Sequence, residues 1–267
     1  MTVGFKFYFM NDVYCEVKGH GHNIVLLHGW GMHGGLWGSF NDLLSKNFQT
    51  HAIDLPGFGF SKEVNSNFTL DALTEVVENY IENIKQPVTV IGWSLGGLIT
   101  QNILKRKKVV LNKIVLIATT PSFTKKEGWN NAMEQSVFDA FANDLKDDFR
   151  KTLKRFLSLQ TRGCELSRDE LRELNNKLNE RGEPNINALE AGLQILSNID
   201  LRSKENNEIS TMIVLGEKDT LVPLPVKNEF EKMFPNLEQV ILEKAGHAPF
   251  ISNPEFCAEK IKNFINE

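Results

Sequence analysis

The sequence of 267 residues has few cysteines, no long apolar run and no excess of positive charge. Cys15, Cys164 and Cys257 are far apart and none forms a CxxC pair, so we expect free thiols in a reducing cytoplasm, without disulfides or a metal site. No apolar run approaches the roughly 20 residues that cross a bilayer. Because the net charge is −4, nucleic acid is not an expected partner. Met1–Met10 lacks the apolar core of a signal peptide, so neither secretion nor a membrane is expected.

The sequence does contain a regular alternation of apolar, β-branched runs and amphipathic helical runs. Length and a hydrophobic content of 41% suit one large domain with a sizeable core. The alternation predicts an α/β fold with a mostly parallel, doubly wound sheet. The expected strands are 5–9, 13–17, 23–27, 50–54, 88–91, 111–119, 211–216 and 237–242, and the expected helices are 69–84, 98–105, 226–233 and 254–265.

The stretch from Trp129 to Ile199 breaks this alternation, because it shows helical periodicity and no convincing strand. Apolar stripes predict two helices around Phe138–Leu145 and Phe149–Leu157. A capping box at Ser167 opens a third helix, and Asn187 is the predicted cap of a fourth. We therefore expect residues 121–204 to form an inserted helical lid, and residues 1–120 and 205–267 to form one core.

A nucleophile is predicted where the buried run at 88–91 meets Gly92-Trp93-Ser94-Leu95-Gly96. Gly-x-Ser-x-Gly between a strand and a helix is typical of a strained turn that exposes a serine hydroxyl at the top of a sheet. Gly92 and Gly96 are expected because a Cβ at either position would collide with a neighbouring element. A serine that only caps the following helix is the alternative.

A serine nucleophile needs a base, and the base needs an orienting carboxylate. His247 follows a late strand and is expected at the same sheet edge as Ser94. Asp219 lies between them in sequence, after another strand, and is the predicted acid. Glu217 and Asp200 are weaker candidates, and Asp54 is interpreted as structural because it precedes the serine.

Donors for an oxyanion complete such a site. The N–H of Leu95 lies at the start of the helix after Ser94 and supplies one. The N–H of Trp30, between two glycines in the loop after strand 23–27, is the predicted second donor. The Trp30 ring is expected to wall the acyl pocket or simply to pack there.

Together these motifs resemble the α/β-hydrolase superfamily. The resemblance covers the whole chain and rests on five places, His28-Gly29-Trp30-Gly31, Asp54-Leu55-Pro56-Gly57-Phe58-Gly59, Gly92-Trp93-Ser94-Leu95-Gly96-Gly97, the Asp219 loop and the His247 loop. It implies the α/β-hydrolase fold and hydrolytic chemistry, but it does not identify the substrate.

A narrower resemblance is to the carboxylesterases of biotin synthesis that act on the methyl ester of pimeloyl-acyl-carrier protein. It rests on residues 28–32, 155–161, 193–196, 200–202 and 247–252. The resemblance implies that the acyl chain is held by Trp30, Ser94, Leu95, Phe156, Leu157, Ser158, Leu159, Gln160 and His247. It also implies that the acidic carrier is gripped by Lys151, Arg155, Arg168 and Arg172. Lys151 departs from the family's arginine and lacks its bidentate fork.

The charge distribution points to the same face. Residues 150–181 hold nine basic and five acidic residues, a net +4 in an acidic chain. A basic lid suits an acidic protein partner, although an ordinary solvated helix face would look the same.

The resulting prediction is a monomeric, cytoplasmic serine carboxylesterase without metal or organic cofactor. It would release methanol from the pimeloyl methyl ester carried by acyl-carrier protein. The alternatives are a short-chain esterase, a thioesterase or a carbon–carbon bond hydrolase of the same fold. A binding protein without activity, built on this scaffold, is a further alternative.

Overall fold

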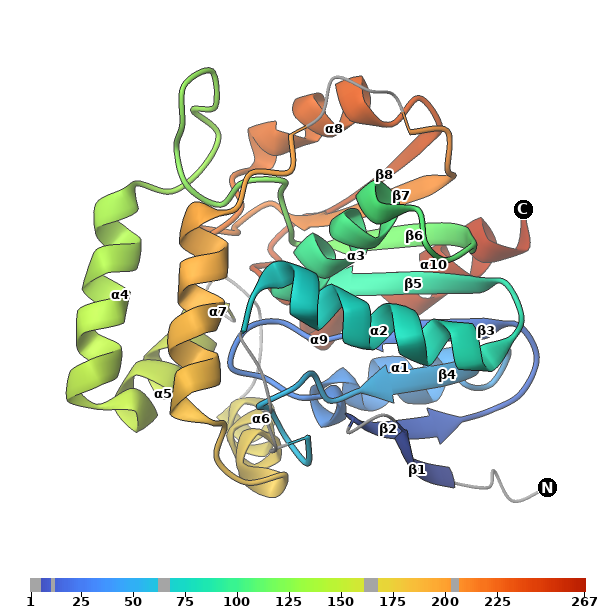
Figure 1. Cartoon of the computed structure of the whole chain (residues 1–267), viewed down its shortest axis with the longest axis horizontal. Helices are drawn as coiled ribbons and strands as arrows, with labels where there is room; N and C mark the ends of the chain where they lie inside the picture. Colours follow the sequence, from blue (N-terminus) through green and yellow to red (C-terminus); the bar gives the residue numbers. More distant parts are fainter. Residues whose placement is uncertain (1–5, 11–12, 62–67, 161–167, 203–206) are drawn as a thin grey trace.

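The computed structural model describes residues 6–10, 13–61, 68–160, 168–202 and 207–267 (Figure 1). Within these ranges, eight strands form one sheet in the order β1-β2-β4-β3-β5-β6-β7-β8. The strands are β1 Lys6–Met10, β2 Val13–Lys18, β3 Asn23–Leu27, β4 Gln49–Ile53, β5 Val88–Trp93, β6 Leu111–Ile117, β7 Thr211–Gly216 and β8 Leu237–Leu242. Each predicted strand is confirmed to within two residues.

Neighbouring strands from β4 to β8 pair in parallel, whereas β1 and β2 are antiparallel. Helices cover both faces, with α2 against α3 on one face and α1 against α10 on the other (Figure 1). The predicted doubly wound α/β sheet is therefore confirmed. The helices of this core are η1 Gly34–Trp37, α1 Gly38–Leu44, α2 Leu70–Ile84, α3 Leu95–Arg106, η2 Leu224–Val226, α8 Lys227–Met233, α9 Pro249–Ser252 and α10 Pro254–Asn266.

Helix α3 begins at Leu95 and not at the predicted residue 98. Its first turn contains Gly96 and Gly97, which have low helix propensity and hide the helical pattern in the sequence. Both glycines are required by packing: a Cβ on Gly96 would lie 2.1 Å from the carbonyl oxygen of Leu27, and one on Gly97 would lie 2.4 Å from Thr119. The helix therefore starts directly after Ser94 and lies very close to β3.

Four further helices lie between β6 and β7 in the sequence: α4 Gln135–Asp147, α5 Phe149–Gln160, α6 Arg168–Glu180 and α7 Ile186–Asn198. We call them the four-helix segment; Figure 1 shows it beside one end of the sheet. The cap of α7 is Asn185, whose side chain accepts from the N–H of Asn187, so the prediction of Asn187 as the cap was wrong by two residues. The predicted capping box at Ser167 lies outside the described residues.

The four-helix segment is tied to the core by a buried ion-pair network. Arg181 is only 7% exposed and its guanidinium bonds Asp54 at 2.7 Å and also Glu16. Asp54 accepts further bonds from the N–H groups of Gly34 and Phe60. Burial raises the pKa of Asp54, and the Arg181 guanidinium opposes that rise. Asp54 is thus a structural carboxylate, and Arg181 does not belong to the basic face with which the sequence grouped it.

Two changes in this segment test how much the network stabilises the fold. Arg181→Met leaves Asp54 buried without its cation, so we expect the free energy of unfolding to fall by about 3–5 kcal/mol. The exposed Lys154→Ala, a matched cation removal in α5, is expected to change it by about 0.5 kcal/mol or less. Urea unfolding of both variants measures the difference, and similar losses in the two would contradict the assignment.

Candidate active site

Ser94 occupies the turn between β5 and α3 with φ 53° and ψ −111°, a region that side chains rarely adopt. Its N–H donates to the Ile117 carbonyl at 3.0 Å, and its carbonyl accepts from the Thr119 hydroxyl at 2.8 Å. A Cβ on Gly92 would lie 2.4 Å from the carbonyl oxygen of Gly96, so the close approach of these two residues requires glycine at position 92. These contacts hold the serine in the strained turn expected of a nucleophile.

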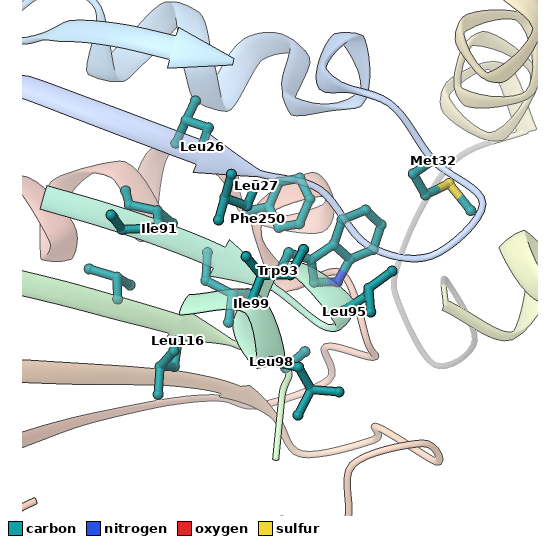
Figure 2. Close-up of a cluster of buried hydrophobic side chains, with 14 of the residues drawn as sticks. Leu26, Leu27, Met32, Ile91, Trp93, Leu95, Leu98, Ile99, Leu116 and Phe250 are labelled. Atoms are coloured by element: carbon teal, nitrogen blue, oxygen red, sulfur yellow. The ribbon is translucent and has the colours of Figure 1, made fainter. Parts of the chain in front are cut away.

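The turn rests on a closely packed core. Figure 2 shows the buried side chains around the end of β5, among them Trp93, Leu95 and Phe250. The Trp93 ring meets that of Phe250 edge to face with centroids 5.0 Å apart, and its N–H donates to the His247 carbonyl at 2.8 Å. The residue beside the serine therefore also fixes the backbone of the predicted base.

Ser94, His247 and Asp219 form one hydrogen-bonded row. His247 Nε2 lies 2.9 Å from Ser94 Oγ, and its Nδ1 lies 2.8 Å from Asp219 Oδ2. Because the carboxylate accepts at Nδ1, the proton lies there and Nε2 is free to accept the serine proton. Asp219 Oδ1 accepts from the N–H groups of Leu221 and Val222, which orient the carboxylate.

The competing carboxylates lie elsewhere. Asp200 is paired with Arg202 at 2.7 Å, and Glu217 is exposed and lies 3.4 Å from Lys218. Among the three carboxylates that the sequence offered, Asp219 is the one that contacts His247.

The loop after β3 approaches the nucleophile closely. A Cβ on Gly29 would lie 3.4 Å from the Ser94 Cβ and 3.3 Å from the Trp93 ring. The next residue, Trp30, is fully buried, and Leu95 begins α3, where helical N–H groups lack partners within the helix. The two N–H groups predicted as oxyanion donors therefore belong to segments that flank Ser94.

The side chain of Trp30 joins this loop to the four-helix segment. Its indole N–H donates to the Leu189 carbonyl at 2.8 Å, and its ring meets Phe156 edge to face with centroids 4.9 Å apart. A Cβ on Gly192 would lie 2.5 Å from the indole. Both α5 and α7 therefore pack on the ring beside the nucleophile.

His28 holds the same loop against the next strand. Its Nε2 accepts from the N–H of Leu55 at 2.9 Å, so Nδ1 carries the proton and donates to the Gly29 carbonyl at 2.8 Å. Burial lowers the pKa of His28 to about 3. The ring is therefore neutral near neutral pH and serves the loop as a fixed donor and acceptor.

A small cavity of about 20 Å³ borders Ser94. Except for Ser94, the side chains that line it are apolar. They are Phe123, Met133, Phe138, Phe141, Phe156, Leu193, Leu196 and Leu221. Of these lining residues, only Ser94 and Phe156 were among those that the sequence assigned to the substrate. The helical stripes of α4 and α7 could have indicated Phe138, Phe141, Leu193 and Leu196, but no sequence signal marks the loop residues Phe123, Met133 and Leu221.

The side chains of residues 156–160 lie on more than one face of α5. Phe156 faces the cavity, whereas Ser158 is exposed and its hydroxyl donates to the Lys154 carbonyl at 3.0 Å. Two residues along a helix rotate a side chain by about 200°, so Phe156 and Ser158 cannot share a face. Leu157 is buried and Leu159 partly buried. The structure thus places the Ser158 side chain away from the cavity to which it was assigned.

Gln160, at the end of α5, is fully buried beside the base. Its carbonyl accepts from the N–H of His247 at 3.0 Å. Neither polar atom of its side-chain amide has a hydrogen-bond partner among the described residues. An unpaired buried amide is costly, and such a group is suited to bind a polar ligand atom.

The predicted basic face is partly neutralised. Lys151 and Arg155 are exposed on α5 and Arg172 is exposed on α6, but Arg155 pairs with Asp144 at 2.6 Å. Arg150 likewise pairs with Glu183. The side chain of Arg168 lies outside the described part of α6. The net +4 counted from sequence therefore overstates the free positive charge of this surface.

The described ranges contain no group of three His, Cys, Asp or Glu side chains arranged to hold a metal, and no helix long and apolar enough to cross a membrane. Burial raises the pKa values of the Cys15 and Cys257 thiols to about 12, and Cys164 lies outside these ranges.

A family model for the alpha/beta hydrolase fold matches residues 23–254. The chain belongs to the α/β-hydrolase family. Among curated α/β-hydrolase relatives, the pimeloyl-[acyl-carrier protein] methyl ester esterase of Nitrosospira multiformis is 38% identical over 260 residues, which cover 95% of this chain and 98% of the relative. The enzyme of that name from Vibrio vulnificus is 34% identical over 257 residues, 96% and 99% of the two chains.

Solved α/β-hydrolase structures share the fold at lower identity. An esterase from Exiguobacterium antarcticum superposes with a TM-score of 0.89 at 22% identity, covering 98% of this chain and 99% of its own. A bromoperoxidase from Bacillus anthracis superposes with a TM-score of 0.87 at 21% identity, covering 96% and 95%. These neighbours confirm the fold.

The pKa of His28 predicts how stability depends on pH. Below about pH 6.5 the unfolded chain takes up a proton at His28 that the folded chain excludes until about pH 3, so acid favours unfolding. Each pH unit in this window removes about 1.4 kcal/mol. Between about pH 7.5 and about pH 5.0, urea unfolding should show wild type losing about 2 kcal/mol more than His28→Asn, whatever the variant's stability at neutral pH. Equal losses would contradict a neutral His28.

A fluorophosphonate probe tests the row of Ser94, His247 and Asp219. Wild type should be labelled and Ser94→Ala should not, whereas the exposed Ser158→Ala should be labelled as wild type. Asp219→Asn should reduce the labelling rate by about 10³–10⁴-fold, because His247 then loses its orienting acceptor. Mass spectrometry locates the label, and labelling of Ser94→Ala at the wild-type rate would exclude Ser94 as the nucleophile.

Proposed function

We propose that the protein hydrolyses the methyl ester of pimeloyl-[acyl-carrier protein], releasing methanol and the carrier-bound carboxylate for biotin synthesis. The observation that carries the proposal is the hydrogen-bonded row of Ser94, His247 and Asp219 at the mouth of an apolar cavity. Relatives 34–38% identical over nearly the whole chain bear the name of this esterase. As the sequence predicts, we expect a single chain acting in the cytoplasm without a cofactor.

In the acylation step, His247 Nε2 takes the Ser94 proton while Ser94 Oγ attacks the ester carbonyl carbon. The new C–O bond converts the carbonyl oxygen into an oxyanion, which the N–H groups of Trp30 and Leu95 would stabilise. The bond from carbon to the methoxy oxygen then breaks, and His247 returns the proton to that oxygen. Methanol leaves and an acyl ester on Ser94 remains.

In the deacylation step, a water molecule replaces methanol. His247 accepts one water proton, the water oxygen bonds to the acyl carbon, and the bond from that carbon to Ser94 Oγ breaks. The proton passes from His247 to Ser94, which restores the starting state. Asp219 stabilises the imidazolium in both steps.

The cavity supports a chain of methylene groups as the substrate. Aromatic and aliphatic side chains surround the nucleophile, so an acyl chain gains free energy by leaving water there. Outside this lining, the buried side-chain amide of Gln160 has no hydrogen-bond partner among the described residues, so its two N–H donors and its acceptor oxygen could bind a polar atom of the substrate. Trp30 and Phe156 supply the adjoining wall.

The four-helix segment would then be a lid on the core. It contributes Phe138, Phe141, Phe156 and two leucines to the cavity, whereas the core contributes the reacting groups. Arg181 anchors the lid at the end of α6. We propose residues 121–204 as this lid and residues 1–120 and 205–267 as the core that it covers.

The exposed face of α5 and α6 would receive the acidic carrier. Lys151, Arg155 and Arg172 present cations there, and we include Arg168 from its position on α6. Exposed cations add mainly to the association rate and lose this effect in salt. A carrier carboxylate would compete with Asp144 for Arg155.

Charge reversal tests the function and the docking face together. In Arg155→Glu with Arg172→Glu, kcat/KM for the carrier-bound methyl ester should fall about tenfold or more at low salt, and by less at high salt. Hydrolysis of p-nitrophenyl butyrate should change by less than about twofold, because the chemistry is untouched.

A matched control reverses two exposed lysines of the core, Lys46→Glu with Lys108→Glu. It should keep the wild-type rate on the carrier-bound ester. A wild-type enzyme that cleaves only the p-nitrophenyl ester would overturn the proposed substrate. If the two double variants hydrolyse the carrier-bound ester equally fast, the proposed docking face is wrong, whereas the proposed substrate stands.

A further inference from the structure

A second hollow lies behind the catalytic cavity, between α4 and α7. These helices run side by side (Figure 1) and are joined by a bond of 2.7 Å from the Gln135 amide to the Ser197 hydroxyl. Polar side chains, including Asp139, Glu190 and Gln194, line the hollow together with apolar groups at its floor. We call it the α4–α7 groove.

The groove and the catalytic cavity share a wall. Phe138 and Leu193 line both spaces, and they are 8% and 5% exposed. Because the same two side chains face the serine cavity on one side and the groove on the other, the wall between them is one side chain thick. Ala142 lines the groove and is not part of the lining of the cavity.

The proposed reaction needs such a path. Every turnover brings one water to the acyl carbon and removes one methanol, while the acyl chain occupies the apolar cavity. The carrier would cover α5 and α6 at that time, whereas the described lining of the groove belongs to α4 and α7. The described lining of the groove therefore includes none of the cations of the proposed docking face.

We propose that the α4–α7 groove is a second opening of the active site, closed by Phe138 and Leu193, through which water enters and methanol leaves during turnover of the carrier-bound ester. Water and methanol are small enough to pass when these side chains change rotamer. The polar side chains of the groove offer hydrogen-bonding groups to water beside the wall. This inference rests on the proposed esterase function.

Reversible blocking of the groove tests this role without relying on the folding of a bulky variant. Ala142→Cys is treated with a benzyl methanethiosulfonate, which attaches a benzylthio group by a disulfide that dithiothreitol removes. For the carrier-bound ester we expect kcat to fall about fivefold or more and KM not to rise, because passage and not docking is blocked and slower arrival of water lets the acyl-enzyme accumulate. Dithiothreitol should restore kcat. With p-nitrophenyl acetate no carrier covers α5 and α6, so water and product can still pass there. The labelled enzyme should hydrolyse this ester at a rate within about twofold of that of the unlabelled enzyme.

Val137→Cys is the matched control, because Val137 is exposed on the same helix and does not line the groove. The labelled Val137→Cys and reagent-treated wild type should keep their rates. If labelled Ala142→Cys hydrolyses the carrier-bound ester as fast as before labelling, water and methanol do not depend on the groove. The inference then fails while the proposed function stands. If untreated wild type does not hydrolyse that ester, the function fails and the inference fails with it.

Discussion

The strained turn at Ser94 is the constraint on which the rest of the site depends. A positive φ at a residue with a side chain costs about 1–3 kcal/mol and persists only where surrounding contacts fix it. Here β6 supplies a backbone acceptor at Ile117, the following Thr119 supplies a hydroxyl donor, and Gly96 allows α3 to lie against β3. Loss of any of these contacts would let the turn relax and move the hydroxyl away from His247.

Parallel strands bring the remaining groups to the same edge. Ser94 follows β5, Asp219 follows β7 and His247 follows β8, so residues far apart in sequence meet where these strands end. The bond from Trp93 to the His247 carbonyl adds a direct link between the serine turn and the histidine loop. The distances of about 3 Å between the three side chains therefore follow from the positions of the strand ends, and no loop has to move to bring these side chains together.

The sequence predicted the features that local sterics determine. It did not predict the features that depend on contacts between residues far apart in the chain. β-branched runs predicted the strands, and Gly-x-Ser-x-Gly predicted the turn, because local sterics dictate both. Arg181 looked like one more surface cation, since nothing near it in sequence shows that Asp54 and Glu16 bury it. Phe123, Met133 and Leu221 escaped for the same reason, because loops have no period that marks an inner face.

The apolar cavity would favour the ester substrate of the proposed reaction over its carboxylate product. A methyl ester is neutral and leaves water for an apolar wall at little cost, whereas the carboxylate that hydrolysis produces loses strong hydration there. Among the described side chains that line the cavity, Ser94 is the polar one, and these described side chains include no Lys or Arg that could pair with the product. The wall that would bind the ester would therefore disfavour the acid. The exposed cations of α5 and α6 would attract the proposed carrier, and none of them is among the described lining of the cavity.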